Sequence, residues 1–306
     1  MISSEVRFFL AVASSGSLSA ASEQLFVAVS AISRKIQRLE AQVGAPLFER
    51  HARGMVLTEA GQIFENHLRK SLLNIEQAMA EIKGLKAVRR TALRVACSNG
   101  LAFSLLPQLM ARFRQQNPAV TFVLTVADSK TLARLVRNGE CDLALQFSLH
   151  PEQGVDVLAS WAAPVLLLMH SDHPLANQQV ALTDLCQYPV CLPEPSTTIR
   201  QLFDICCQMS GTFIEPVLTC DNFAALFNFL QVSPRAVSIC SQFTVLPLLQ
   251  QPITIKSFGV DQLSQRTLQL QLPPGRQRSA ALQLFVEFVS DTLNQEDSAV
   301  RRRYAL

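Results

Sequence analysis

The sequence predicts a small helical N-terminal domain, a long helix and a larger α/β domain, and three patterns support this division. Apolar residues first recur at helical spacing, then follow a proline-free heptad pattern, and after residue 91 form short strands that alternate with helices. The 306 residues are too many for one ordinary domain, and a hydrophobic content of 49% is enough to build large cores. We therefore expect domains over residues 1–58, 59–88 and 89–306.

Charge is unevenly distributed along the chain. Residues 1–90 carry 12 Lys and Arg against 8 Asp and Glu, whereas the remaining residues carry 15 against 16. The net charge of +3 is too small to indicate a partner by itself. Its concentration in the first third indicates that this part of the chain meets a polyanion.

The N-terminal domain is predicted to contain three helices and a β-hairpin. Apolar spacing places the helices around Val6–Ala13, Ser19–Leu25 and Ile32–Val43. Two apolar runs at 46–48 and 55–57 flank a polar, basic turn with a glycine, which is typical of a hairpin. This is the element order of a helix-turn-helix followed by a wing, a motif that places its last helix against DNA. The alternative is a solvated basic face on an ordinary three-helix bundle.

A long helix is predicted from Glu59 to about Leu85. Thr58 is a suitable N-cap, and Glu59 lies in the first turn, where the helix dipole favours negative charge. At 1.5 Å per residue the helix is about 40 Å long. Its apolar heptad stripe consists of Leu68, Leu72, Ile75, Met79 and Ile82. We favour a dimer contact through this stripe over packing against the helix's own domain.

Strands and helices alternate in the last two thirds of the chain, which indicates parallel βαβ units. The expected strands are Leu93–Cys97, Val120–Val126, Asp142–Phe147, Val165–Met169, Val190–Leu192, Ala236–Cys240 and Thr267–Leu272. The expected helices are Leu101–Gln116, Ser129–Asn138, Ser196–Met209, Asn222–Gln231 and Ser279–Leu293.

Membrane insertion and secretion are not expected. The uncharged run over 236–255 contains prolines and glutamines, which favours buried strand and turn over a membrane span. The apolar stretch near the N-terminus is too short for a signal peptide. We therefore expect a cytoplasmic protein whose eight cysteines are reduced and mostly buried.

A specific motif extends through the first 61 residues. It comprises FLAVA at 9–13, GSLSAA at 16–21, SAIS at 30–33, LF at 47–48 and LTEAG at 57–61. In these residues the chain resembles the LysR-type transcriptional regulators. The resemblance implies a winged helix-turn-helix, a dimerising linker helix and a two-lobed effector-binding domain similar to type 2 periplasmic binding proteins. The later residues agree more loosely, for example in GECDLA at 139–144.

Two segments depart from the family pattern. The family usually has Ser or Thr followed by Gln at the start of the third helix, where this chain has Ala28 and Val29. Ala28 lacks the side-chain oxygen that caps a helix, at a cost of about 1 kcal/mol relative to Ser. Val29 cannot hydrogen-bond a base edge and can only pack, for example on a thymine methyl group. The family's glycine-rich run in the second lobe is replaced by VSPRAVSI at 232–239.

The expected partners are double-stranded DNA, further copies of the chain as a homodimer or tetramer, and a small-molecule effector. Short polar groups in the third helix suit base edges, and cations there and in the wing suit phosphates. The residues predicted to contact DNA are Ser17, Val29, Ser30, Ser33, Arg34, Lys35, Arg38, Arg50 and Arg53.

The effector is expected in a cleft between a first lobe, about 91–161 and 267–295, and a second lobe, about 162–266. Free N–H groups and small hydroxyl groups at helix N-termini bind anions, so we expect a small anionic metabolite. The candidate residues are Ser98, Asn99, Ser129, Thr131, Ser196, Thr197 and Thr198. Their alternative role is plain helix capping.

Other functions have weaker support in the sequence. The pairs Cys186/Cys191 and Cys206/Cys207 would suit a redox-sensing regulator, but no cation adjoins Cys206 to lower a thiol pKa. A solute-binding protein would have a signal peptide and no helix-turn-helix, and an enzyme would need a catalytic constellation that we do not find. We therefore predict a regulator with no catalytic residue, no metal and no cofactor other than a non-covalently bound effector.

Overall fold

The computed structural model describes residues 3–51, 54–84, 91–150, 152–248, 251–275 and 278–304. The chain divides into two compact units, Met1–Ala87 and Val88–Leu306. No described helix combines the length and apolar character that crossing a membrane requires.

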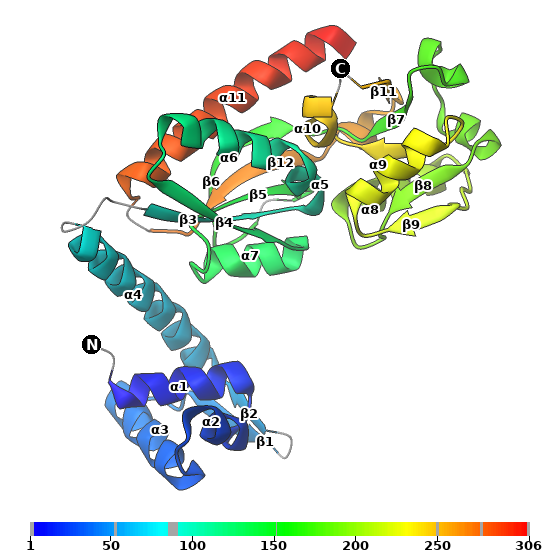
Figure 1. Ribbon diagram of the computed structural model, residues 1–306. Helices are drawn as coiled ribbons and strands as arrows, with labels where there is room; N and C mark the ends of the chain where they lie inside the picture. The colour runs from blue at the N-terminus through cyan, green and yellow to red at the C-terminus, as the bar shows by residue number, and fades with distance from the viewer. Residues whose placement is uncertain are drawn as a thin grey trace. The chain divides into compact units, whose positions relative to one another are not determined.

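The N-terminal unit is helical apart from one hairpin (Figure 1). Its elements are α1 (Ser4–Ser15), α2 (Leu18–Leu25), α3 (Val29–Val43), β1 (Phe48–His51), β2 (Gly54–Leu57) and α4 (Glu59–Gly84). Gly16 and Gly44 adopt left-handed backbone angles directly after α1 and α3, which ends both helices. The predicted three helices, hairpin and long helix are therefore confirmed.

The first turns of α4 belong to the core of this unit. The ring of Phe64 packs 5.3 Å from that of Phe9, and Leu68 packs against the same cluster. Thr58 caps α4 as predicted, because its Oγ1 accepts a hydrogen bond from the Gly61 amide at 3.0 Å. A side chain at Gly61 would collide with the carbonyl oxygen of Leu47, so this position needs glycine.

The C-terminal unit consists of two lobes, each built on a five-stranded sheet (Figure 1). Lobe 1 has the strand order β4-β3-β5-β12-β6, and lobe 2 has the order β11-β7-β10-β8-β9. The lobe 1 elements are β3 (Thr91–Cys97), α5 (Asn99–Phe103), α6 (Leu105–Gln116), β4 (Val120–Val126), α7 (Ser129–Arg137), β5 (Leu143–Ser148), β6 (Asp156–Ala162), β12 (Thr267–Leu272) and α11 (Ala280–Tyr304). The lobe 2 elements are β7 (Leu166–His170), η1 (Pro174–Asn177), η2 (Leu182–Gln187), β8 (Val190–Pro193), α8 (Thr198–Met209), β9 (Leu218–Cys220), α9 (Phe223–Val232), β10 (Val237–Cys240), α10 (Gln242–Val245), η3 (Leu246–Leu248), β11 (Ile253–Ser257) and η4 (Asp261–Ser264).

The sheets are mixed rather than wholly parallel. Strands β3, β4 and β5 pair in parallel in lobe 1, as do β8, β9 and β10 in lobe 2. Strands β12 and β7, which follow the passages between lobes, pair antiparallel with their neighbours. The chain enters each of these two strands from the other lobe. Parallel pairing requires a crossover connection, usually a helix, between strands of the same sheet, and neither strand is preceded by one. Strands β6, β9 and β11 were not predicted.

The single helix predicted over Leu101–Gln116 is wrong. Two helices, α5 and α6, meet at Ser104, whose φ of −146° is not helical. Pro107 explains the break: it has no N–H to donate to the Phe103 carbonyl, and its ring would clash with that group in a continuous helix.

Two chain segments pass between the lobes and are hydrogen-bonded to each other. The Ala163 amide donates to the Arg266 carbonyl and the Val165 amide donates to the Leu263 carbonyl, both at 2.8 Å. The predicted division at 162 and 266 matches these passages, with one exception. Phe243 of α10, which precedes the second passage in sequence, packs into the lobe 1 core.

Candidate functional site

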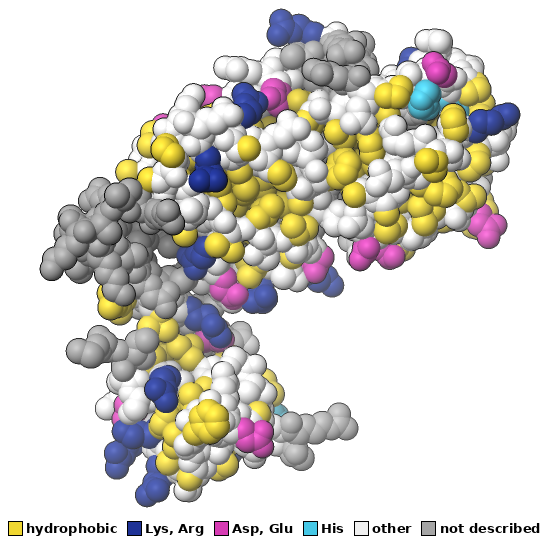
Figure 2. Space-filling view, in the orientation of Figure 1, with side chains coloured by type: hydrophobic (Ala, Val, Ile, Leu, Met, Phe, Trp, Pro, Cys, Tyr) yellow, Lys and Arg dark blue, Asp and Glu magenta, His cyan; other side chains and the backbone are white. Residues whose placement is uncertain are grey.

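Helix α3 presents an exposed face at its N-terminal end. Val29 is 40% exposed, and the N-cap Ala28 makes no side-chain hydrogen bond. Ser30, Arg34 and Arg38 are also exposed. Figure 2 shows Lys and Arg side chains gathered on the side of the N-terminal unit where α3 lies. The exposed surface of α3 therefore combines cations with an apolar first residue, Val29.

Several predicted DNA-contact residues are held by bonds within the unit. The Arg34 Nε donates to the Ser30 carbonyl at 3.3 Å. The Arg50 Nη2 donates to the Ser33 Oγ at 3.3 Å, which joins the wing to α3. Ser17 caps α2, since its Oγ accepts from the Ser19 and Ala20 amides. Arg53 lies outside the described residues.

Lys35 is paired with a carboxylate of its own unit, and its contact with DNA stays a prediction. Its Nζ lies 2.6 Å from the Glu5 Oε1, and this ion pair ties α3 to α1. The hydrogen bond from Lys35 is the main cause that lowers the pKa of Glu5 to about 2. Lys35 faces the neighbouring helix because it lies one position from Arg34, about 100° further around α3.

Sequence reasoning missed Phe26 in the turn before α3. Phe26 is 95% exposed and is the only non-glycine residue with positive φ, 55°, among the described residues. Phenylalanine is normally expected inside a core, so no sequence signal marked it as an exposed turn residue. An aromatic side chain in a strained, solvated position suggests a contact surface.

The apolar stripe of α4 divides into two parts. Leu68 packs on the core of its own unit and Leu72 is half-buried. Ile75 and Met79 remain 43% and 53% exposed. The side chain of Ile82 lies outside the described residues. Packing on the same unit therefore accounts for the start of the stripe, and the dimer contact stays a prediction for Ile75 and Met79.

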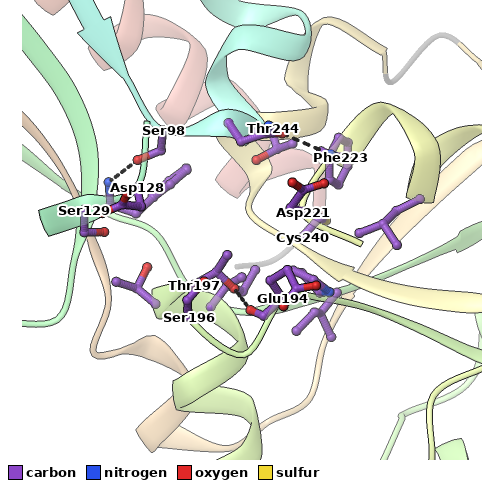
Figure 3. Close-up of a pocket in the computed structure, with 18 of the residues that line it drawn as sticks. Ser98, Asp128, Ser129, Glu194, Ser196, Thr197, Asp221, Phe223, Cys240 and Thr244 are labelled. Atoms are coloured by element: carbon purple, nitrogen blue, oxygen red, sulfur yellow. Dashed lines mark hydrogen bonds between the residues drawn. The ribbon is translucent and has the colours of Figure 1, made fainter. Parts of the chain in front are cut away.

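A cavity of about 340 Å³ lies between the two lobes. Figure 3 shows Ser98, Asp128 and Ser129 of lobe 1 facing Ser196 and Thr197 of lobe 2 across it. Six of the seven predicted effector residues line this cavity, namely Ser98, Asn99, Ser129, Ser196, Thr197 and Thr198. Thr131 does not line it.

Side chains of the protein already cap α7 and α8 at the cavity, whereas Ser98, the N-cap residue of α5, makes no capping hydrogen bond. Asp128 accepts the amide and hydroxyl hydrogen bonds of Thr131 at 3.0 and 2.9 Å, which lowers the pKa of Asp128. Thr197 caps α8 by accepting from the Arg200 amide. The capping alternative is thus correct for Thr197, whereas Thr131 donates to the capping residue Asp128. In the described part of the chain, the hydroxyl groups of Ser129 and Thr198 make no hydrogen bond.

Asn99 and Ser98 hold the cavity in shape. The Asn99 Oδ1 accepts from the Phe223 amide at 3.0 Å, a hydrogen bond that links lobe 1 to the start of α9 in lobe 2. The Ser98 Oγ accepts from the Phe147 amide at 3.3 Å within lobe 1. Asn99 therefore connects the lobes directly.

Sequence reasoning did not select several polar residues that line the cavity, among them Glu194, Asp221, Thr244 and Arg266. Arg266 is 2% exposed, and its Cζ lies 4.0 Å from the centroid of the Phe147 ring. Burial lowers the pKa of Arg266 to about 9, so the guanidinium is still charged at neutral pH. The sequence does contain a signal for Arg266. This cation directly precedes β12, the strand that returns the chain to lobe 1, and so lies at the predicted boundary between the lobes.

Burial disfavours the thiolate form of five of the eight cysteines. Burial raises the pKa of Cys191 to about 11 and those of Cys97 and Cys207 to about 12. Burial also raises the pKa of Cys206 and Cys240. Thiols held protonated in this way are poor nucleophiles. Among the described residues, no group of three or more His, Cys, Asp and Glu could hold a metal ion.

Two protein families match successive parts of the chain. Residues 4–62 match the bacterial regulatory helix-turn-helix protein family of lysR type, and residues 86–294 match the LysR substrate binding domain.

Curated relatives are similar over different lengths. A probable RuBisCO transcriptional regulator of Synechocystis is 31% identical over 204 residues, which are 65% of this chain and 59% of that protein. A probable RuBisCO transcriptional regulator of Cyanidioschyzon merolae is 27% identical over 293 residues, which are 92% of this chain and 95% of that protein.

Solved structures share the fold at low sequence identity. A full-length OxyR variant from Pseudomonas aeruginosa gives a TM-score of 0.60 at 19% identity and covers 96% of this chain and 94% of its own. Full-length CbnR complexed with its target DNA gives 0.58 at 20% identity, covering 95% and 99%. The regulatory domain of Synechocystis CcmR in complex with 2-PG gives 0.52 at 19% identity, covering 66% and 96%.

Proposed function

The chain belongs to the LysR family of bacterial regulatory helix-turn-helix proteins, and we propose that α3 reads operator DNA while the cavity between the lobes binds the effector. As a member of this family it is a DNA-binding transcriptional regulator modulated by an effector. The observation that carries the proposal is a cavity lined from both lobes in a chain that also carries the helix-turn-helix.

DNA recognition is assigned to the N-terminal end of α3. Val29, Ser30 and Arg34 are exposed there and suit base edges in the major groove. Arg38 and Arg50 are exposed cations further along α3 and in the wing, where they suit phosphates. The CbnR structure with its target DNA supports this role for a protein of the same fold.

Effector control is assigned to the equilibrium between lobe arrangements. A ligand that contacts both lobes favours one arrangement, by an amount equal to its differential affinity for the two. In a dimer joined through Ile75 and Met79, that shift would change the spacing of two DNA-binding units and thus which half-sites they occupy. We propose no chemical turnover and a site of action in the cytoplasm, where the DNA is.

A redox-sensing regulator is the second candidate and has less support. Its reactive thiol needs a lowered pKa, whereas burial raises the pKa of five cysteines here. The bound 2-PG in the CcmR regulatory domain supports effector binding in a domain of this fold.

The DNA assignment is tested by selecting genomic fragments with the purified full-length protein. We expect the enriched fragments to share an inverted repeat, with half-sites about one helical turn apart or a multiple of it. Fragments without any shared sequence would contradict sequence-specific binding.

The effector assignment is tested by screening metabolites for a thermal shift of the full-length protein. Ser129→Ala in lobe 1 and Thr198→Val in lobe 2 remove cavity hydroxyl groups that make no internal hydrogen bond in the described structure. We expect each to weaken a genuine hit several-fold, while Thr125→Val, on the exposed part of β4, leaves it unchanged. A hit that ignores both cavity variants would place the effector elsewhere.

A further inference from the structure

Arg266 is a buried charge at the boundary between the lobes. It lies in the passage that leads into β12, and its carbonyl accepts the Ala163 hydrogen bond that joins the two passages. It is the largest of the fully buried side chains. Among the cavity-lining residues it is also the one Lys or Arg. A group bound to Arg266 would therefore lie at the hinge.

The guanidinium has donors that the described protein does not satisfy. Its Nε and Nη1 are buried and have no hydrogen-bond partner among the described residues. Its recorded contacts there are the Phe147 ring and the neighbouring Cys240 thiol, and neither is an anion. Burying a cation without an anionic partner costs free energy, so the presence of Arg266 at this position needs an explanation. An anion bound in the cavity would pair with the guanidinium and offset this cost.

Two acidic residues, Glu194 and Asp221, follow neighbouring strand ends on the lobe 2 side of the cavity. Parallel strands β8 and β9 pair in the register Pro193↔Cys220, and Glu194 and Asp221 follow directly. The Glu194 amide donates to the Cys220 carbonyl at 3.2 Å, which keeps the two strand ends together. Both residues line the cavity, toward the end opposite Asp128 and Ser129 (Figure 3).

These carboxylates are available to a ligand, unlike Asp128. Both Asp128 oxygens are occupied by Thr131. Asp221 receives a long bond from the Cys220 thiol, at 3.8 Å, and the Glu194 carboxylate has no partner among the described residues. Two negative charges on neighbouring strand ends favour a cationic hydrogen-bond donor and disfavour a second anion.

We propose that the effector is a small zwitterion, of the amino-acid class, whose carboxylate binds Arg266 and whose ammonium group faces Glu194 and Asp221. This inference rests on the proposed function, since it names the ligand of the same cavity. The volume of about 340 Å³ is at the small end of ligand pockets, which suits a metabolite of this size. Binding to Arg266 also places the ligand charge at the hinge, where it can bias the lobes.

The test measures thermal shifts of the full-length protein with each of the twenty amino acids. Every hit is compared with its deaminated hydroxy acid and with its methyl ester, which lack the ammonium and the carboxylate respectively. We expect at least one amino acid to raise Tm, with both analogues binding at least tenfold more weakly. Non-amino dicarboxylates and inorganic phosphate form a separate arm and are expected to give no shift.

Variants separate the two ends of the site. Arg266→Met should abolish the amino-acid shift and Arg266→Lys should keep part of it. Asp221→Asn and Glu194→Gln should each weaken the amino acid at least tenfold but affect its deaminated analogue much less. Asp172→Asn is the control, because Asp172 is an exposed carboxylate that does not line the cavity.

Arg266→Met also gives a readout without any ligand. Removing an unpaired buried charge should leave the Tm of the free protein unchanged or raise it. A large fall in Tm would mean that Arg266 is satisfied within the protein, and it would overturn the proposal. So would the absence of any amino-acid shift.

The outcomes also distinguish this inference from the proposed function. A phosphate ester or dicarboxylate that binds and is weakened by Ser129→Ala or Thr198→Val would overturn the zwitterion while leaving the cavity as the effector site. An amino acid that binds equally to all cavity variants would overturn both.

Discussion

Neighbouring residues of α3 have different surroundings, and this assigns them different roles. Arg34 is exposed on the same face as Ser30, one turn earlier, whereas Lys35 is paired with Glu5 of α1. Arg38 is exposed, one turn beyond Arg34. A charge that is already neutralised by the protein adds little to DNA binding, so of the two predicted phosphate contacts we expect Arg38 to contribute more than Lys35.

We predict that Arg34→Ala weakens binding to a selected operator by about 1–3 kcal/mol, because a bidentate base contact is worth that much. Binding to random DNA should change much less. Arg38→Ala should weaken both and reduce the salt slope by about 0.9, the value for one phosphate contact. Fluorescence anisotropy over a salt series measures both quantities.

Lys35→Ala is the matched control for these two variants. Its main effect should be a lower Tm, through loss of the contact with Glu5, with an unchanged salt slope. A salt slope reduced as much as in Arg38→Ala would show that Lys35 contributes as much to phosphate binding as Arg38.

The apolar start of α3 leads to a second residue-level prediction. Val29 presents methyl groups and no hydrogen-bonding atom, so its base contact should be a thymine methyl group. Replacing thymine by uracil removes only that methyl group. At one operator position we expect this change to cost about 0.8 kcal/mol, the value of one buried methylene, in wild-type protein.

The Val29→Ala variant completes the comparison. It should bind thymine and uracil operators with nearly equal affinity, because its shorter side chain does not reach the methyl group. If wild-type protein shows no uracil penalty at any position within a half-site, Val29 does not read thymine.

At the scale of elements, local signals predicted helices better than strand direction. The glycines after α1 and α3 and the Thr58 cap act within one turn of chain, so their effects could be read from the sequence. The break at Ser104 was also local, but the effect of Pro107 on the carbonyl four residues earlier was overlooked. The antiparallel pairing of β7 and β12 depends on the passages between lobes, which no local pattern records.

The sequence predicted part of the cavity lining, as it predicted part of the fold. Small polar residues at helix starts, five of them with hydroxyl groups, identified six of its lining residues, because helix starts face the cleft in both lobes. The sequence could not show that Asp128 and Thr197 cap two of these helices and occupy N–H groups expected to bind the effector, because capping depends on side-chain geometry. Arg266 stands at the predicted boundary between the lobes, but its burial beside the cavity depends on two distant passages that meet around it.

The exposed part of the α4 stripe supports an element-level prediction. Ile75→Glu should convert dimers to monomers, because it would place a charge in the helix contact formed by Ile75 and Met79. Analytical ultracentrifugation measures the change. Asn66→Glu is the control, since Asn66 is exposed and lies about 180° from Ile75 around the helix. An unchanged mass for Ile75→Glu would exclude this stripe as the dimer contact.

At the scale of the regulatory unit, apolar contacts such as Phe103 on Phe223 join the lobes, and two sets of hydrogen bonds accompany them. The hydrogen-bonded passages at Ala163 and Arg266 act as the hinge, and the Asn99–Phe223 hydrogen bond joins the lobes across the cavity. The hinge is covalent and permits several arrangements, whereas the Asn99 bond exists only when the lobes are close. The Asn99 bond therefore favours the arrangement in which both lobes can contact one ligand.

We predict that Asn99→Ala weakens effector binding about 3–10-fold, because a single hydrogen bond contributes about 0.5–1.5 kcal/mol to the closed arrangement. Titration calorimetry with a hit from the metabolite screen measures the affinity. Asn222→Ala is the matched control: Asn222 caps the same helix, α9, by accepting from the Ala224 amide within lobe 2. It should lower Tm through loss of the cap yet leave the affinity nearly unchanged. Equal losses of affinity in both variants would show that the order of α9, rather than the connection between lobes, sets effector binding.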